Sequence, residues 1–92
     1  MNQCVCITLV VNTSLIPFRG FIQKSAQKLA IEGIGNVLAP HTIKIVVHGA
    51  HDAIDEFIDV LYTGCDGIRP ASVAVEPFVK DRDYRGVFRI IS

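Results

Sequence analysis

The chain has 92 residues, half of them apolar, and its nine basic and nine acidic residues give a formal net charge of zero. A protein that binds nucleic acid usually carries an excess of lysine and arginine, so the balanced charge predicts no nucleic-acid partner. No apolar run reaches the ~18 residues of a membrane span, and the N-terminus lacks the pattern of a signal peptide. We therefore expect one small, soluble, cytoplasmic domain over residues 1–92, with no membrane partner.

The three cysteines, Cys4, Cys6 and Cys65, are an odd number in a chain without a secretion signal. This favours reduced thiols in the cytoplasm over a disulfide framework. Cys4 and Cys6 lie two residues apart on an expected strand, so they point to the same sheet face. A structural metal site needs four nitrogen or sulfur ligands, and only one further cysteine is present, so we expect free thiols and no metal.

The first expected element is a strand over residues 4–12, where apolar residues recur at every second position. Its apolar face carries Val5, Ile7, Leu9 and Val11. After a turn, helical spacing predicts an amphipathic helix over residues 18–31. Its buried stripe consists of Phe18, Phe21, Ile22, Ala26 and Leu29. Gly33 is expected to end this helix, because glycine is frequent just past a helix C-terminus.

The rest of the chain predicts a hairpin, a second helix and two more strands. Residues 34–38 and 42–48 flank a turn and predict paired strands. A second amphipathic helix opens at Asp52 and stops near Tyr62. Its buried stripe consists of Ile54, Phe57, Ile58 and Leu61. Alternation returns at residues 72–78 and 87–91, and Pro77 marks an edge or a strand end because proline cannot donate to a ladder.

The element order is β-α-β-β-α-β, followed by a short last strand. Two amphipathic helices and strands with one apolar face predict an α+β fold of the ferredoxin-like kind. In this α/β sandwich a mostly antiparallel sheet carries both helices on one face.

The strand-to-helix turn at residues 11–20 is the leading candidate for a functional site. Backbone N–H groups at the start of a helix can converge on an anion, and Arg19 in the first turn can add a fork of donors. The alternative for Arg19 is a solvated arginine on a helix surface. His41, His48 and His51 have no nucleophile or further metal ligands placed with them, so we expect surface histidines and no metal site.

The span from Val11 to Arg19 resembles the phosphate-binding turn of the acylphosphatase family, which has the form G-x-V-Q-G-V-x-F-R. The chain keeps Ile16 as a conservative replacement, together with Phe18 and Arg19. Further similarity lies in Arg69–Val73, in Val75–Phe78 and in residues 84–90. The stretch Val75–Phe78 is also similar to the acylphosphatase-like domain of the hydrogenase-maturation carbamoyltransferase.

The resemblance implies an enzyme that hydrolyses acyl phosphates, the mixed anhydrides of a carboxylic acid and phosphate, with no metal or organic cofactor. In the family, loop amides and the arginine hold the phosphoryl group, and an asparagine on the second strand orients the attacking water. Carried over to this chain, the catalytic residues are Arg19 and Asn36. The phosphate-binding residues are then Thr13, Ser14, Leu15, Ile16, Phe18 and Arg19. Such a site is chemically sufficient, since phosphoryl transfer depends mainly on positioning and on stabilising charge.

The turn departs from the family pattern at three positions. Ser14 and Leu15 replace the glutamine and the second glycine of the family turn. A glycine in an anion-binding turn supplies positive φ or close backbone approach, which leucine does poorly. Pro17 has no N–H, so one potential phosphate donor is missing, although proline also suits the first turn of a helix.

The asparagine is displaced by one residue. Counting from Arg19 without a gap, the family position falls on Val37, and Asn36 comes one residue earlier. A slip of one residue along a strand turns a side chain to the other face of the sheet. Asn36 can therefore orient water only if a bulge near Gly33 and Gly35 restores its direction.

Two functions from different classes remain open. One is an acyl phosphate hydrolase weakened by the altered turn, and its small-molecule partner is an acyl phosphate or a phosphate anion. The other is a catalytically inactive member of the fold that binds an anion or a protein partner. One sheet face carries apolar side chains on which two copies could pair, so we expect a monomer or a weak homodimer. These side chains are Cys4, Cys6, Val10 and Val46.

Overall fold

The computed structural model describes residues 2–13, 15–64, 67–77 and 88–91. In chain order its elements are β1 (Asn2–Val10), α1 (Ile16–Lys28), β2 (Glu32–Ala39), β3 (Thr42–Ala50), α2 (His51–Thr63), β4 (Ser72–Pro77) and β5 (Phe88–Ile91). This order confirms the predicted β-α-β-β-α-β arrangement with a short last strand.

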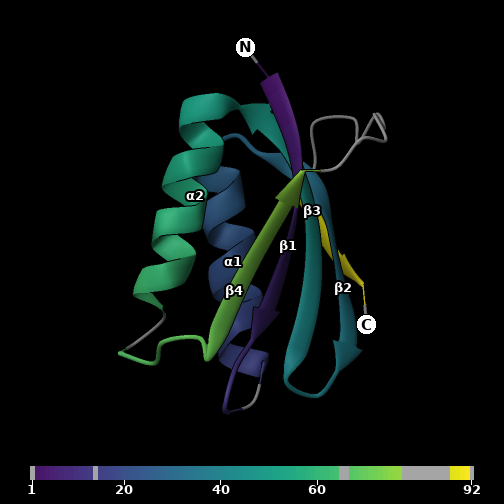
Figure 1. Cartoon of the computed structure of the whole chain (residues 1–92), viewed down its shortest axis with the longest axis vertical. Helices are drawn as coiled ribbons and strands as arrows, with labels where there is room; N and C mark the ends of the chain where they lie inside the picture. Colours follow the sequence, from purple (N-terminus) through teal and green to yellow (C-terminus); the bar gives the residue numbers. More distant parts are fainter. Residues whose placement is uncertain (1, 14, 65–66, 78–87, 92) are drawn as a thin grey trace.

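The five strands form one sheet in the order β4-β1-β3-β2-β5. All neighbouring strands are antiparallel except β2 and β5, which run parallel. Both helices lie on the same face of this sheet (Figure 1). The predicted ferredoxin-like α+β fold is therefore confirmed. Pro77 ends the edge strand β4, in agreement with the predicted edge position.

The core lies between the helices and one face of the sheet. Strand pairing sets Val73, Leu9, Ile43 and Val37 in one row across four strands, with Leu9 and Ile43 fully buried at its centre. The predicted stripes of the helices cover this face. Their buried members are Phe18, Ile22 and Ala26 on α1, and Ile54, Phe57 and Leu61 on α2. The alternation along β1 and the helical spacing therefore predicted the buried surface correctly.

The end of α1 differs from the prediction, because Gly33 does not terminate this helix. Ala30, two residues past the helix end, takes the left-handed conformation with a φ of 57°. The N–H groups of Ala30 and Ile31 donate to the carbonyl oxygens of Gln27 and Ala26, at 3.2 and 2.9 Å. This is the Schellman arrangement, in which glycine usually occupies the left-handed position. An alanine was not recognisable as a terminator from the sequence alone.

Gly33 instead lies inside β2, where its φ is 155°. It pairs with Val47 of β3, and a Cβ at this position would overlap the carbonyl oxygen of Val46. The glycine is therefore required by the close approach of two strand backbones.

The face of the sheet away from the helices is called the open face below. Cys4, Cys6, Val10 and Val46 lie on it, because they alternate with the residues of the core face. Cys4 and Cys6 are free thiols, and Cys6 is only 6% exposed. Cys65 lies outside the described residues. Pairing of two copies through the open face stays a prediction, and so does the single domain over residues 1–92.

Within the described ranges, neither helix has the length and apolar character that crossing a membrane requires.

Candidate functional site

The turn between β1 and α1 lies at the end of the sheet where the β2–β3 hairpin also turns (Figure 1). The Val11 N–H donates to the His41 carbonyl oxygen at 2.9 Å, and His41 Nδ1 lies 2.7 Å from the Thr13 carbonyl oxygen. The second bond needs a hydrogen on Nδ1, because a carbonyl oxygen only accepts. From the α2–β4 connection, the Ala71 N–H donates to the Val10 carbonyl oxygen at 2.6 Å. Two neighbouring connections therefore hold the start of the turn.

The N-cap residue of α1 forms no side-chain cap hydrogen bond. Leu15 occupies the N-cap position with φ −72° and ψ −13°, and the first helical turn contains no acidic residue. The Arg19 N–H donates to the Leu15 carbonyl oxygen at 2.9 Å and closes the first turn. Pro17 lies within this turn and has no N–H to donate. The positive end of the helix dipole is thus not offset by a negative side chain of the first turn.

The side chains of the turn divide between the core and the solvent. Leu15 is 5% exposed and Phe18 is fully buried, and both belong to the core cluster. Ile16 is 77% exposed, and Thr13 is exposed as well. Ser14 lies outside the described residues. Where the family turn has a flexible glycine, this chain therefore has a leucine that anchors the turn by burying its side chain.

Arg19 is half-buried on the first turn of α1. Within the part of the chain that the structure describes, no carboxylate forms an ion pair with its guanidinium. A guanidinium next to a helix N-terminus can donate in a fork to two oxygens of a phosphoryl group. Arg19 therefore adds a positive charge to the first turn of α1, at the positive end of the helix dipole.

The geometry of β2 does not support the predicted role of Asn36. The register between β2 and β3 is regular over residues 32–37, and its shift falls between Val37 and Ala39. The bulge that Asn36 needs would have to lie before it, beside the glycines of the strand. Asn36 is instead exposed on the open face, directly opposite Lys44 of β3. The strand alternation turns Asn36 away from the helices, and its role as the water-orienting residue stays a prediction.

Val37, the residue of β2 that follows Asn36, lies on the face of the sheet that the helices cover. It pairs with Ile43 and packs against the same core cluster that contains Leu15 and Phe18 of the turn region. An isopropyl side chain has no hydrogen-bonding group, so it cannot orient a water molecule. At this position β2 therefore presents an apolar residue to the helices.

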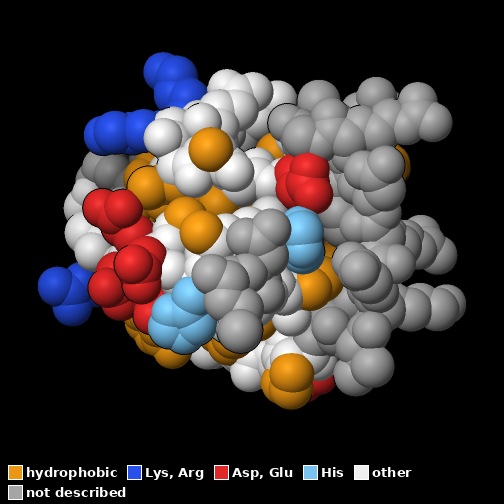
Figure 2. All heavy atoms as spheres, turned by 90° about the horizontal axis from the view of Figure 1, so that it is seen from above, with side chains coloured by type: hydrophobic (Ala, Val, Ile, Leu, Met, Phe, Trp, Pro, Cys, Tyr) orange, Lys and Arg blue, Asp and Glu red, His pale blue; other side chains and the backbone are white. Residues whose placement is uncertain are grey.

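The remaining histidines pair with acidic residues. His48 Nδ1 lies 2.9 Å from Glu32 Oε1, while His51 Nδ1 lies 3.4 Å from Asp55 Oδ2 and 3.7 Å from Asp52 Oδ1. Figure 2 shows the end of the molecule opposite the turn, where histidine and acidic side chains lie next to each other. Among the residues with described positions, no three histidine, cysteine or acidic side chains are grouped as a metal ion would require.

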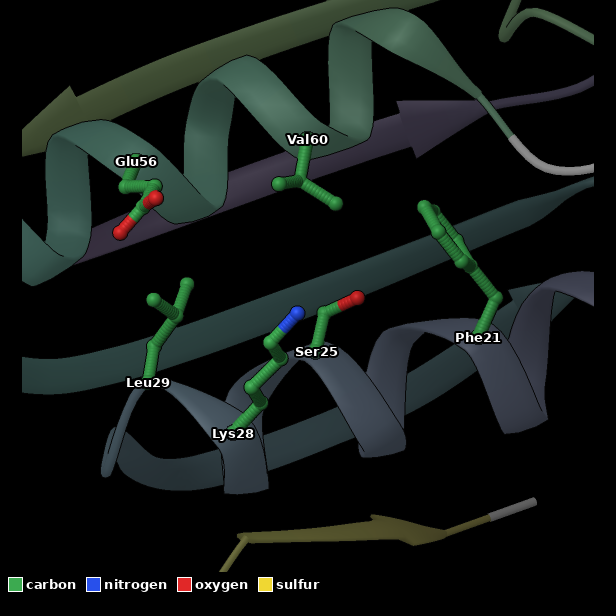
Figure 3. Close-up of a pocket in the computed structure, with 6 residues that line it drawn as sticks. All are labelled: Phe21, Ser25, Lys28, Leu29, Glu56 and Val60. Carbon is green, nitrogen blue, oxygen red and sulfur yellow. The ribbon is translucent and has the colours of Figure 1, made fainter.

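A cavity of about 230 Å³ lies between the two helices (Figure 3). It is lined by Phe21, Ser25, Lys28, Leu29, Glu56 and Val60. Lys28 of α1 and Glu56 of α2 flank it from opposite sides (Figure 3). None of the residues proposed to bind phosphate lines this cavity, so it is separate from the turn.

Comparison with known proteins identifies the family. The family profile described as Acylphosphatase matches residues 15–90. The chain belongs to the acylphosphatase family. It is 32% identical over 72 residues to an acylphosphatase from Caldivirga maquilingensis, which covers 77% of this chain and 76% of that relative.

Solved structures agree with this assignment. An acylphosphatase from Coxiella burnetii is 25% identical, with a TM-score of 0.82 over 98% of this chain and 93% of that chain. Full-length HypF in its phosphate- and nucleotide-bound form is 23% identical, with a TM-score of 0.83 over 100% of this chain and 12% of that chain. The similarity to HypF shows a shared fold only. It agrees with the similarity of Val75–Phe78 to the hydrogenase-maturation carbamoyltransferase, although Phe78 lies outside the described residues.

The family match begins at Leu15, so it includes Arg19 but not Thr13. The sequence analysis did not identify the contact between Thr13 and His41. These residues are 28 positions apart, and only the turn of the hairpin beside the helix start brings them together. No local sequence pattern would have revealed this contact.

Proposed function

We propose that this protein is a slow acyl phosphate hydrolase that holds the phosphoryl group at the start of α1. The family to which it belongs acts on acyl phosphates. The observation that carries the proposal is Arg19 in the first turn of α1, where it forms no ion pair with any described carboxylate and where the turn contains no acidic residue. Phosphoryl transfer needs charge stabilisation and positioning more than an acid or base side chain, and this arrangement supplies positive charge.

In this proposal Arg19 donates to the phosphoryl oxygens, and the backbone at the start of α1 contributes to binding the same group. Pro17 contributes no N–H, so the remaining amides of the turn carry the binding. Leu15 contributes through packing, since its buried side chain fixes the position of the turn. No metal ion or organic cofactor takes part.

The low rate follows from Val37. With Asn36 on the open face and Val37 on the core face, no amide of β2 orients the attacking water. A water held only by the substrate and by solvent reaches the in-line position less often, so the rate falls while phosphate binding is retained.

The test is hydrolysis of an aryl acyl phosphate by the wild-type protein and by Arg19→Ala. Lys24→Ala is the matched control, because Lys24 is an exposed cation further along α1. We expect hydrolysis above the uncatalysed rate that Arg19→Ala abolishes and Lys24→Ala leaves unchanged. Equal hydrolysis rates for the wild type and Arg19→Ala would contradict the proposal.

A second candidate is an inactive member of the family that only binds anions, and it is favoured by the exposed position of Asn36 on the open face. Titration of the protein with inorganic phosphate, followed by amide NMR, separates the two. Shifts confined to the turn without any Arg19-dependent hydrolysis would establish the binding-only function. We also propose that the protein works in the reducing cytoplasm, which agrees with the reduced thiol of Cys6.

A further inference from the structure

A row of three reactive side chains crosses the open face at the end of the sheet away from the turn. Strand pairing sets Cys4 of β1 directly opposite His48 of β3, and His48 directly opposite Glu32 of β2. Side chains directly opposite on one face of an antiparallel pair have Cβ atoms about 4.5–5.5 Å apart. The fold therefore places a thiol, an imidazole and a carboxylate, from three separate strands, next to one another on one face of the sheet.

The carboxylate fixes the imidazole. Glu32 Oε1 lies 2.9 Å from His48 Nδ1, and the two side chains are only 22% and 23% exposed. A carboxylate accepts the hydrogen on Nδ1 and stabilises the imidazolium, which leaves Nε2 as the nitrogen that can take a proton. Partial burial strengthens this bond relative to the same pair in water.

We propose that Cys4, His48 and Glu32 form a nucleophilic thiol site that reacts with carbon electrophiles carrying a leaving group. His48 Nε2 accepts the thiol proton, and Glu32 holds the resulting imidazolium. The Cys4 thiolate sulfur then forms a bond to the electrophilic carbon while the leaving group departs with its electron pair. This arrangement of nucleophile, base and orienting acid is the general pattern of an activated thiol. It does not depend on the function proposed for the turn.

Cys6 provides a contrast within the same strand and on the same face. It lies opposite Val46 and Glu76, so no histidine faces it. It is 6% exposed, and burial raises the pKa of its thiol. A buried thiol without a base is inert, so Cys6 serves as an internal reference for the reactivity of Cys4.

Metal binding is the other chemistry that cysteine, histidine and glutamate share. Over the described ranges, no three such side chains are grouped as a metal ion would require. The row is extended across the strands, with His48 in the middle, which suits proton transfer along a line better than convergence on one ion.

The experiment measures alkylation of the full chain by iodoacetamide at pH 7, with peptide mapping to follow Cys4 and Cys6 separately. Alkylation forms the sulfur–carbon bond and releases iodide. We expect His48→Gln to slow Cys4 on the order of 10-fold, because most of a thiol without a base is protonated at this pH. His51→Gln is the matched control and leaves the Cys4 rate unchanged, since His51 lies on α2. An unchanged Cys4 rate in His48→Gln would overturn the proposal.

The Cys6 rate reports whether a variant has loosened the sheet. If His48→Gln raises the Cys6 rate, the proposal is tested with Glu32→Gln instead. This change is isosteric and keeps a hydrogen-bonding side chain opposite His48. Glu32→Gln is expected to slow Cys4 severalfold with Cys6 unchanged, and an unaffected Cys4 rate would overturn the proposal. The double variant is expected to match His48→Gln alone, because Glu32 acts only through His48. Additive losses of the Cys4 rate would show that Glu32 affects Cys4 by another route. They would contradict the proposal that the three side chains act together.

Discussion

The two faces of the sheet carry different kinds of side chain. Under the helices, Leu9, Ile45 and Val47 are fully buried, and among the described residues none that is buried is polar or charged. The open face carries half-buried polar groups such as His48 and Glu32, together with the exposed Asn36. Side chains on the covered face stabilise the fold by their burial, while side chains on the open face can bind or react. The same contrast occurs within β2, where Asn36 lies on the open face and Val37, at the next position, lies on the covered face.

The largest expected effect concerns the covered face. Phe57 is fully buried on α2 and meets Phe88 of β5 with ring centroids 6.4 Å apart. Phe57→Ala is expected to lower the free energy of unfolding by about 4 kcal/mol, through lost burial and a residual cavity. Urea denaturation measures the loss. Val46→Ala on the open face is the comparison and should cost about 1 kcal/mol or less. Similar losses for both would show that the open face contributes to the core.

The next effect concerns Gly33, where the backbones of β2 and β3 approach closely. Gly33→Ala is expected to destabilise the protein by about 3 kcal/mol, because φ is 155° and the added Cβ meets the Val46 carbonyl oxygen. Gly20→Ala is the matched change, since a Cβ there meets nothing within 4 Å. It should instead stabilise α1 by about 0.5–1 kcal/mol. Thermal unfolding of both variants checks the opposite signs, and a tolerated Gly33→Ala would contradict the strand register.

A smaller effect is expected for catalysis and follows from the two faces of β2. Val37→Asn restores an amide on the covered side and should raise hydrolysis of an aryl acyl phosphate about 10-fold, equivalent to about 1.4 kcal/mol of barrier. Asn36→Ala on the open side should leave the rate unchanged. The urea midpoint of Val37→Asn must be measured in parallel, because Val37 packs against the core. A loss of activity in Asn36→Ala would reverse the assignment of the two positions.

The smallest effect concerns the connection that leads from α1 to the sheet. Ala30 takes a left-handed conformation with a φ of 57° and is exposed. Ala30→Gly should raise the free energy of unfolding by about 0.5 kcal/mol, because glycine adopts this conformation without steric cost. The gain is small since glycine also gains freedom in the unfolded chain. Destabilisation by Ala30→Gly would show that the alanine side chain makes an unrecognised contact.

Sequence reasoning was strongest where periodicity is strict. The alternation of Ile7 and Leu9 predicted the buried face of β1, and the spacing of Ile54, Phe57 and Leu61 predicted the buried stripe of α2. It was weakest at the end of α1, where an alanine takes a position that glycine usually occupies. The roles of Arg19 and of the turn residues stay predictions, because their test is chemical.

The sequence by itself determined the order of the elements, the apolar face of each and the family resemblance of the turn, since these depend on residues close together in the chain. Only the tertiary structure decided which way Asn36 faces, because that depends on where the β2–β3 register shifts. It likewise decided that His41 supports the turn and that Cys4, His48 and Glu32 form a row. These contacts join segments that are distant in sequence. A local sequence pattern predicts which residues share a face of a strand, but it does not predict which residues of two strands pair.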